Sequence, residues 1–247
     1  MSARAALTVP LLAVLALGGV ATPSSTAYDV AAPSRAATAP DPADFTRGMV
    51  TNPWFPLKPG TRTVFHGTKD GSPSRDVVVV LHRTRTIQGV VCRAVWDRLF
   101  LDGVLEERTI DWYAQNRSGD VWYFGERTAE LDEQGNVVSR EGSWLAGRDG
   151  ARAGIFMTAH PQVGQTRQQE FYPGHAEDMF RVIDTSGSVT VPLLWSGSAL
   201  VTREWTPLEP DVVDHKFYVR DLGLVLEQSV RGPVEGDRLV SVGHVHR

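Results

Sequence analysis

The sequence predicts an all-β fold: a single antiparallel meander of eight to eleven strands, curved into a half-barrel or a barrel, with little helix. Three observations lead to this prediction. Short runs of β-branched and aromatic residues follow one another from residue 61 onward. Glycine-containing turns separate these runs at short intervals. No stretch shows an apolar stripe over three helical turns, and the best short helical candidate is residues 175–183.

Two central segments are typical of strands in a core. The run Val77–Leu81 is continuously apolar, which predicts a strand covered on both faces. In the next segment, Val90, Cys92, Ala94 and Trp96 share one face because side chains alternate along a strand. Cys92 is the only cysteine, so we expect a buried core thiol and no intrachain disulfide.

Residues 1–27 have the features of a secretory signal peptide. Arg4 precedes an apolar run of about 15 residues, and small residues stand before an expected cleavage site near Ala27. The run is shorter than the roughly 20 residues of a membrane-spanning helix. We therefore expect export, no membrane span and a secreted, extracellular protein.

The remaining chain divides into a linker and one domain. Residues 28–44 are rich in Ala and Pro and have almost no large apolar side chain, which predicts a disordered linker. Residues 45–247 are long enough to form a single β domain with its own core. The chain has 25 basic and 29 acidic side chains and a net charge of −4, which does not favour nucleic acid as a partner.

The segment DWYAQNRSGDVWYFGE, residues 111–126, predicts a hairpin. Asn116 suits the first position of a type I turn and Gly119 suits the left-handed residue that follows, so Asn116 pairs with Asp120. Counting outward pairs Tyr113 with Tyr123, which gives a core face (Trp112, Ala114, Trp122, Phe124) and a polar aromatic face (Asp111, Tyr113, Gln115, Tyr123). In this register Asp111 and Glu126 point to opposite faces, so they do not form a pair of catalytic carboxylates.

The polar aromatic face is the expected place for a ligand. A second polar segment, Gln165–Tyr172, has no apolar face, which indicates an edge strand or, alternatively, a strand that lines a wet cavity. The ligand-binding candidates are therefore Asp111, Tyr113, Gln115, Tyr123, Gln168, Glu170 and Tyr172. The expected partner is an apolar or amphipathic small molecule or a cell-envelope component, bound by a secreted non-enzymatic β protein.

Two alternatives stay open. His175, Glu177 and Asp178 stand close together and are possible ligands of a divalent metal, to which His244 and His246 could add, although solvated loop residues are the simpler interpretation. A secreted hydrolase using Asp111, Glu170, Glu177 or Asp178 is the other alternative. The chain has no nucleophile elbow, phosphate-binding loop or dinucleotide fingerprint, so we assign no catalytic residue and expect no cofactor.

Four phrases of the sequence resemble a group of exported bacterial β-rich proteins of uncharacterised function: NPWFPLKPGTRTVFHG, DWYAQNRSGDVWYFGE, TREWTPLEP and HKFYVRDLGLVLE. In that group a phrase N-P-x-F-P-L-x-P-G-T opens the domain and a phrase G-L-V-x-E closes it. The resemblance spans most of residues 50–228 and implies a shared fold, but no chemistry. More distantly, the rhythm of strands and turns is similar to half-barrels that carry lipoproteins or lipids in the bacterial envelope. That likeness concerns architecture only.

Overall fold

The computed structural model describes residues 40–245 of the chain. The predicted signal peptide and residues 28–39 of the predicted linker lie outside the described residues. Strands make up 63% of the structure and helix 1%, which confirms the predicted all-β class. The helix η1 (Pro42–Asp44) is a single 3-10 turn, capped by Asp41. In the described part of the chain, no helix has the length and hydropathy needed to cross a membrane.

Fifteen strands form one antiparallel sheet. They are β1 (Thr61–Lys69), β2 (Ser72–Ile87), β3 (Val90–Leu101), β4 (Val104–Gln115), β5 (Val121–Leu131), β6 (Val137–Ser139), β7 (Trp144–Leu145), β8 (Arg152–Met157), β9 (Thr166–Gln168), β10 (Glu170–Phe171), β11 (Met179–Val191), β12 (Leu194–Trp205), β13 (Val213–Val219), β14 (Gly223–Arg231) and β15 (Gly236–His244). Four of these, β6, β7, β9 and β10, have three residues or fewer, which explains why the count exceeds the predicted eight to eleven. The segment 175–183 is not helical, because β11 begins at Met179.

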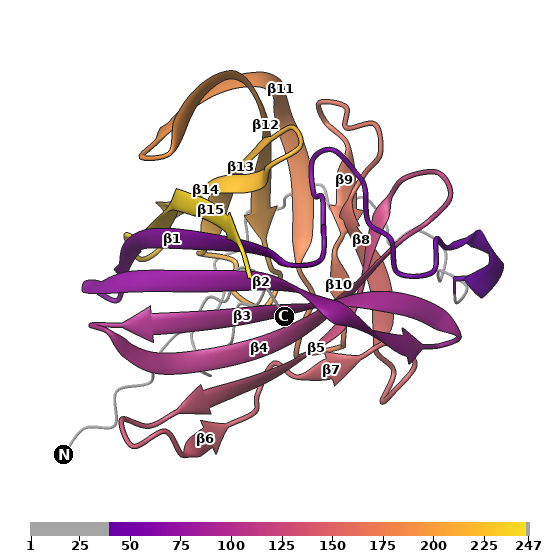
Figure 1. The fold of residues 1–247 in the computed structure, drawn as a ribbon, viewed down its shortest axis with the longest axis horizontal. Coiled ribbons are helices and arrows are strands. Elements are labelled where there is room, and N and C mark those ends of the chain that lie inside the picture. The colour runs from indigo at the N-terminus through magenta and orange to yellow at the C-terminus, as the bar shows by residue number, and fades with distance from the viewer. Residues whose placement is uncertain (1–39, 246–247) are drawn as a thin grey trace, which may run out of the picture.

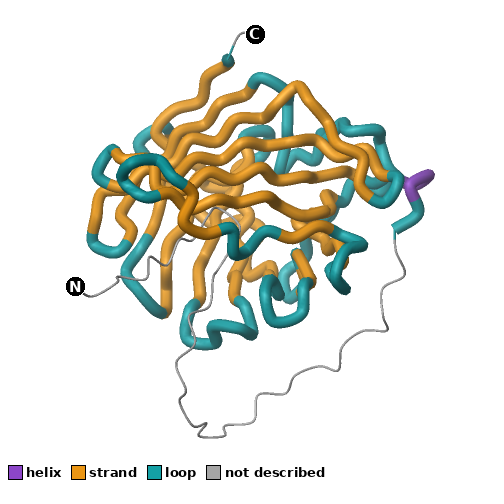
Figure 2. The backbone as a smooth tube through the Cα atoms, turned by 90° about the horizontal axis from the view of Figure 1, so that it is seen from below, coloured by secondary structure: helices purple, strands orange, loops and turns teal. Residues whose placement is uncertain are grey.

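The sheet is curved but not closed into a barrel (Figure 1). Its order is β10-β8-β5-β4-β3-β2-β1-β15-β14-β13-β12-β11-β9, so the pairing of β1 with β15 joins an N-terminal and a C-terminal meander. Figure 2 shows the long strands running side by side. The two ends of the sheet, β9 and β10, are separated in the chain by Gln169 alone. The polar segment Gln165–Tyr172 therefore supplies edge strands, as predicted.

The hairpin of β4 and β5 confirms the predicted turn. The Asn116 amide donates to the Asp120 carbonyl at 2.9 Å, and Gly119 has a φ of 93°. Tyr113 lies opposite Tyr123, also as predicted.

Beyond Tyr113 the predicted register is wrong. A β-bulge lies between Tyr113 and Asp111, so Asp111 lies opposite Glu126 rather than opposite Gly125. Gly125 accommodates the extra residue with a φ of 130°, a backbone conformation that glycine alone adopts readily. Asp111 and Glu126 consequently share a face, and the predicted separation of these two carboxylates is corrected.

Aromatic residues of the N-terminal segment pack against both faces of this hairpin. Phe45 contacts Trp122 and Phe124 edge-on, with ring centroids 6.0 and 5.5 Å apart. Phe55 contacts Tyr113 on the opposite face at 5.2 Å. The predicted polar aromatic face is therefore packed by the chain's own side chains at this end of the sheet.

The central strands pack as predicted. Val80 belongs to the main core, whereas Val77 and Val79 pack with Val64 in a small cluster of their own, so β2 is covered on both faces. Cys92 is 0% exposed, and burial raises the pKa of its thiol. This agrees with the prediction of a core thiol.

Candidate functional site

The two faces of β2–β5 carry opposite charges. Because side chains alternate along a strand, Asp97 of β3 points to the same face as its buried neighbours Val95 and Leu99, while Trp96 and Arg98 point to the other face. We call the first face the inner face and the second the outer face. The inner face holds carboxyl groups and the outer face holds arginines.

The inner face contains a layer of buried carboxyl groups. The charged residues of this layer lie opposite one another on neighbouring strands. Asp111 lies opposite Glu126, and Glu227 lies opposite both Lys216 and Asp237. The members that are at most 9% exposed are Asp76, Asp97, Glu107, Asp111, Glu126, Glu170, Glu204 and Glu227. A buried carboxylate is costly unless it is paired, so many of these groups must hold a proton or contact a cation.

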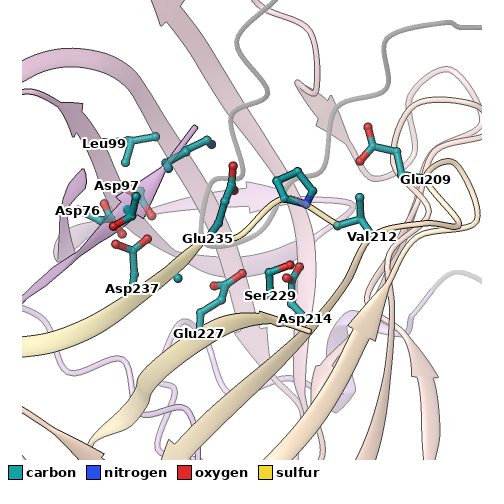
Figure 3. A pocket seen from close by; sticks show the side chains of 14 residues that line it. Asp76, Asp97, Leu99, Glu209, Val212, Asp214, Glu227, Ser229, Glu235 and Asp237 are labelled. Atoms are coloured by element: carbon teal, nitrogen blue, oxygen red, sulfur yellow. The ribbon is translucent and has the colours of Figure 1, made fainter. Parts of the chain in front are cut away.

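Asp76 and Asp97 form a close carboxyl pair beside a cavity (Figure 3). Burial and the neighbouring Asp97 raise the pKa of Asp76 well above its usual value. Burial also raises the pKa of Asp97, to about 6, although the neighbouring Asp76 opposes the rise. Near neutral pH, Asp76 therefore holds a proton beside an ionised Asp97.

The cavity beside this pair has a volume of about 40 Å³ and is lined by Lys69, Asp214, Glu227 and Asp237 as well as by the pair itself. This volume holds a few water molecules. The Lys69 ammonium has no hydrogen-bond partner among the described residues, and burial lowers its pKa. This cavity therefore has room for water, but not for an organic ligand.

A second carboxyl group cluster lies where β4, β5 and β10 meet. The Tyr123 hydroxyl donates to Asp111 Oδ1 at 2.8 Å. Burial raises the pKa of Asp111, Glu126 and Glu170. Glu170 and Asp111 raise the pKa of Glu126 further, and Asp111 also raises that of Glu170. All three residues are at most 2% exposed, so the structure brings these acids together but gives a substrate no access to them.

Lys216 is the main cation of the layer. Its ammonium lies 3.3 Å from Glu204 and 3.5 Å from Glu227. Burial opposes the charge on Lys216, but the two glutamates outweigh burial and raise its pKa. Burial raises the pKa of Glu227 to about 8 even though Lys216 opposes the rise.

The other predicted ligand-binding residues do not converge. Tyr113 is fully buried and stacks on Tyr123 with ring centroids 4.8 Å apart. Gln115 accepts hydrogen bonds from the backbone amides of residues 51 and 52, so it holds the N-terminal segment. Gln168 pairs with Met179 at the sheet edge, and Tyr172 lines a depression of about 270 Å³ that Glu126 and Arg127 also line.

The predicted metal ligands also point to different partners. The His175 ring stacks on Tyr172 at 4.3 Å, and Glu177 accepts a hydrogen bond from the Gly174 amide. Asp178 interacts with Glu170 instead, and burial raises its pKa to about 7. Among residues 40–245, no group of three or more His, Cys, Asp or Glu side chains is arranged to hold a metal ion. His246 lies outside the described residues.

The outer face carries an accessible groove that the sequence did not predict. It has a volume of about 740 Å³ and spans β2–β5. Arg83, Arg108, Arg127 and Arg140 line it, Trp96 and Ile110 form part of its wall, and none of its lining residues is acidic. We call this the arginine groove.

Within residues 40–245, the guanidinium groups of the arginine groove have no acidic partner. No ion pair to any of its four arginines occurs within the described residues. Arg98, beside the groove, lies directly opposite Arg108 across β3 and β4 and covers the Trp96 ring at 4.1 Å. The sequence shows arginines alternating with residues that face inward, but only the strand register shows that these arginines share one surface.

Comparisons with known proteins found distant structural similarity only. No family model and no curated protein matches the chain. A protein described as exported, with a YmcC-like fold, from Bacteroides fragilis is 13% identical, with 77% of this chain and 98% of that chain covered and a TM-score of 0.43. A protein described as a lipoprotein, from Parabacteroides distasonis, is 10% identical, with the same coverage and a TM-score of 0.41. At such scores neither similarity bears on what this chain does.

Proposed function

We propose that the protein is a secreted, non-enzymatic binding protein that holds a negatively charged, amphipathic ligand in the arginine groove. The observation that carries this proposal is the composition of the groove. Four arginines line it without a carboxylate, and apolar side chains lie between them. Exposed cations without acidic partners are available to an external anion.

The volume of the arginine groove favours the outer face over the inner face as the place where a ligand binds. Sites for small organic molecules usually have volumes of roughly 300 to 1,000 Å³. The arginine groove, at about 740 Å³, lies within this range, whereas the inner cavity of about 40 Å³ does not. The ligand site expected on the polar aromatic face is therefore proposed for the opposite face.

The groove offers two kinds of contact. A guanidinium group presents its N–H donors as a fork that matches a phosphate or a carboxylate. Trp96 and Ile110 supply an apolar surface beside these donors. A ligand with an anionic group and a hydrocarbon portion satisfies both.

Isothermal titration calorimetry tests the proposal better than tryptophan fluorescence, because Trp96 is one of seven tryptophans. Dodecyl phosphate and the uncharged dodecyl maltoside are titrated below their critical micelle concentrations. We expect saturable binding of the phosphate and about tenfold or more weaker binding of the maltoside, since a hydrogen bond to a charged group contributes about 1.5 to 3 kcal/mol. Binding of neither amphiphile, or equal binding of both, would contradict the proposal.

A further inference from the structure

We infer that the natural ligand of the arginine groove is a linear phosphodiester chain, of which several phosphate groups bind at once. This inference rests on the proposed function and adds the chemical class of the ligand. The spread of the arginines, their mutual repulsion and the shape of the groove support it.

The arginines are too widely spread for a single anion. Arg83 belongs to β2 and Arg127 to β5, and in the sheet β3 and β4 lie between these strands. Neighbouring strands are about 4.8 Å apart, so the groove is roughly 14 Å wide across the strands. One phosphate group reaches one or two of these guanidinium groups, whereas a chain of phosphates reaches all of them.

The positive surface also extends beyond the groove. Cross-strand pairing places Arg62, Val79, Trp96, Ile110 and Arg127 in one row across five strands. Arg98 lies directly opposite Arg108. Burial and the charges of Arg62 and Arg75 lower the pKa of the Arg98 guanidinium. Like charges opposite each other destabilise a sheet, and a bound polyanion would relieve the repulsion between Arg98 and Arg108.

The shape of the groove favours a chain over a membrane surface. A bilayer is flat and touches only the rim of a groove, whereas an extended chain lies inside it. Proteins that bind bilayers by insertion present exposed aromatic or aliphatic side chains. In this groove Trp96 and Ile110 are partly buried, and the Arg98 guanidinium covers the Trp96 ring.

A phosphodiester chain fits both kinds of contact in the groove. Each phosphate carries one negative charge and accepts forked hydrogen bonds from arginine. The carbon groups between successive phosphates can lie against Trp96 and Ile110. A chain of carboxylates places its charges on flexible side groups and lacks this alternation along the backbone.

The test uses the mature protein and five probes. These are a poly(glycerol phosphate) chain of about ten repeats, glycerol 3-phosphate, a poly-glutamate chain of equal charge, dodecyl phosphate, and vesicles of phosphatidylglycerol. The variant R108E/R127E reverses two charges of the groove. The matched control R181E reverses one exposed arginine on β11, away from the groove. Circular dichroism and thermal unfolding establish that both variants fold.

We expect the phosphodiester chain to bind at least about 100-fold more tightly than glycerol 3-phosphate, because each additional charged contact contributes about tenfold. R108E/R127E should lose this binding, and R181E should keep it within about twofold. If four phosphates are neutralised, affinity should fall roughly 50- to 150-fold between 50 and 200 mM salt.

The other outcomes separate this inference from the proposed function. If dodecyl phosphate binds but the chain binds no tighter than glycerol 3-phosphate, the inference is wrong and the proposed function stands. Equal or tighter binding of poly-glutamate, or binding of vesicles without binding of the soluble chain, also overturns the inference. If none of the probes binds, both proposals fail.

Discussion

Asp111 of β4 lies directly opposite Glu126 of β5, and both carboxyl groups are buried on the inner face of the sheet. The hairpin turn alone would separate them. The β-bulge at Gly125 brings them together, and Glu170 of β10 joins them. The pair is part of a larger layer of buried acids, and this layer leads to specific expectations for stability.

The first expectation concerns pH. Burial raises the pKa of Asp97 to about 6, of Asp178 to about 7 and of Glu227 to about 8. Above pH 4 the unfolded chain releases protons that the folded protein still holds, so the free energy of unfolding should be highest near pH 4 and fall as pH rises through 8. One pKa unit corresponds to about 1.4 kcal/mol, so Asp97 alone should contribute on the order of 3 kcal/mol. Urea unfolding at several pH values measures this decrease.

The variant Asp76→Asn is the control for this pH dependence. The asparagine amide has the shape of a protonated Asp76 side chain, but it has no proton to lose in this pH range. We expect little change at pH 4, higher stability than wild type at pH 8 and a smaller slope between them. A variant that follows the wild-type curve would show that the Asp76–Asp97 pair does not contribute to the pH dependence.

A second expectation separates the two stacked tyrosines. Tyr123→Phe should lower the free energy of unfolding by about 1 to 3 kcal/mol, because Asp111 loses its buried hydrogen-bond donor. Tyr113→Phe is the matched control, since the Tyr113 hydroxyl has no hydrogen-bond partner among the described residues and should be dispensable. Denaturant unfolding of both variants at pH 7 makes the comparison. Equal losses would argue against a specific role of the Tyr123 hydrogen bond.

A third expectation concerns the β-bulge. Gly125→Ala should cost about 3 kcal/mol or more, because its φ is 130° and an added Cβ would lie 2.5 Å from the Trp144 carbonyl oxygen. Gly135→Ala is the control: its φ is 81°, but nothing lies within 4 Å of an added Cβ. This control should cost only about 1 to 2 kcal/mol. Thermal unfolding measures both, and a Gly125 variant no less stable than the control would refute the proposed role of the bulge.

A fourth expectation concerns Lys216. Lys216→Met removes the cation that lies between Glu204 and Glu227 and leaves both carboxylates buried. At pH 8 we expect a loss of about 3 to 5 kcal/mol. At pH 5 the loss should be smaller, because Glu227, whose pKa burial raises to about 8, then holds a proton. Guanidinium unfolding at the two pH values tests this difference, and a loss independent of pH would indicate that packing, not charge, explains the effect.

Local sequence patterns were sufficient to predict the all-β class, the antiparallel sheet and one hairpin turn. The runs of β-branched residues and the glycine turns predicted the antiparallel sheet, and Asn116 with Gly119 predicted the turn that pairs Tyr113 with Tyr123. These features depend on residues close together in the chain. The prediction failed beyond Tyr113, because nothing in the turn signals a bulge at Gly125.

The candidate site was less accessible to prediction. Asp111, Tyr123 and Glu170 were identified from their residue types, and the structure places them together in the interior rather than around an open ligand site. An acid on the apolar face of a strand, such as Asp97, was a usable signal for the buried layer. The arginines of the groove gave no such signal, because exposed arginines are common on any strand.

The sequence by itself determined the all-β class, the main turns, the core position of Cys92 and the edge character of residues 165–172, because alternation and turn chemistry act over a few residues. Only the tertiary structure decided that Asp111 lies opposite Glu126, that Lys216 meets Glu204 and Glu227, and that Arg83, Arg108 and Arg127 share a groove. Each of these depends on the pairing register of different strands. A shift of one residue moves a side chain to the other face of a sheet, so register decides which charges meet.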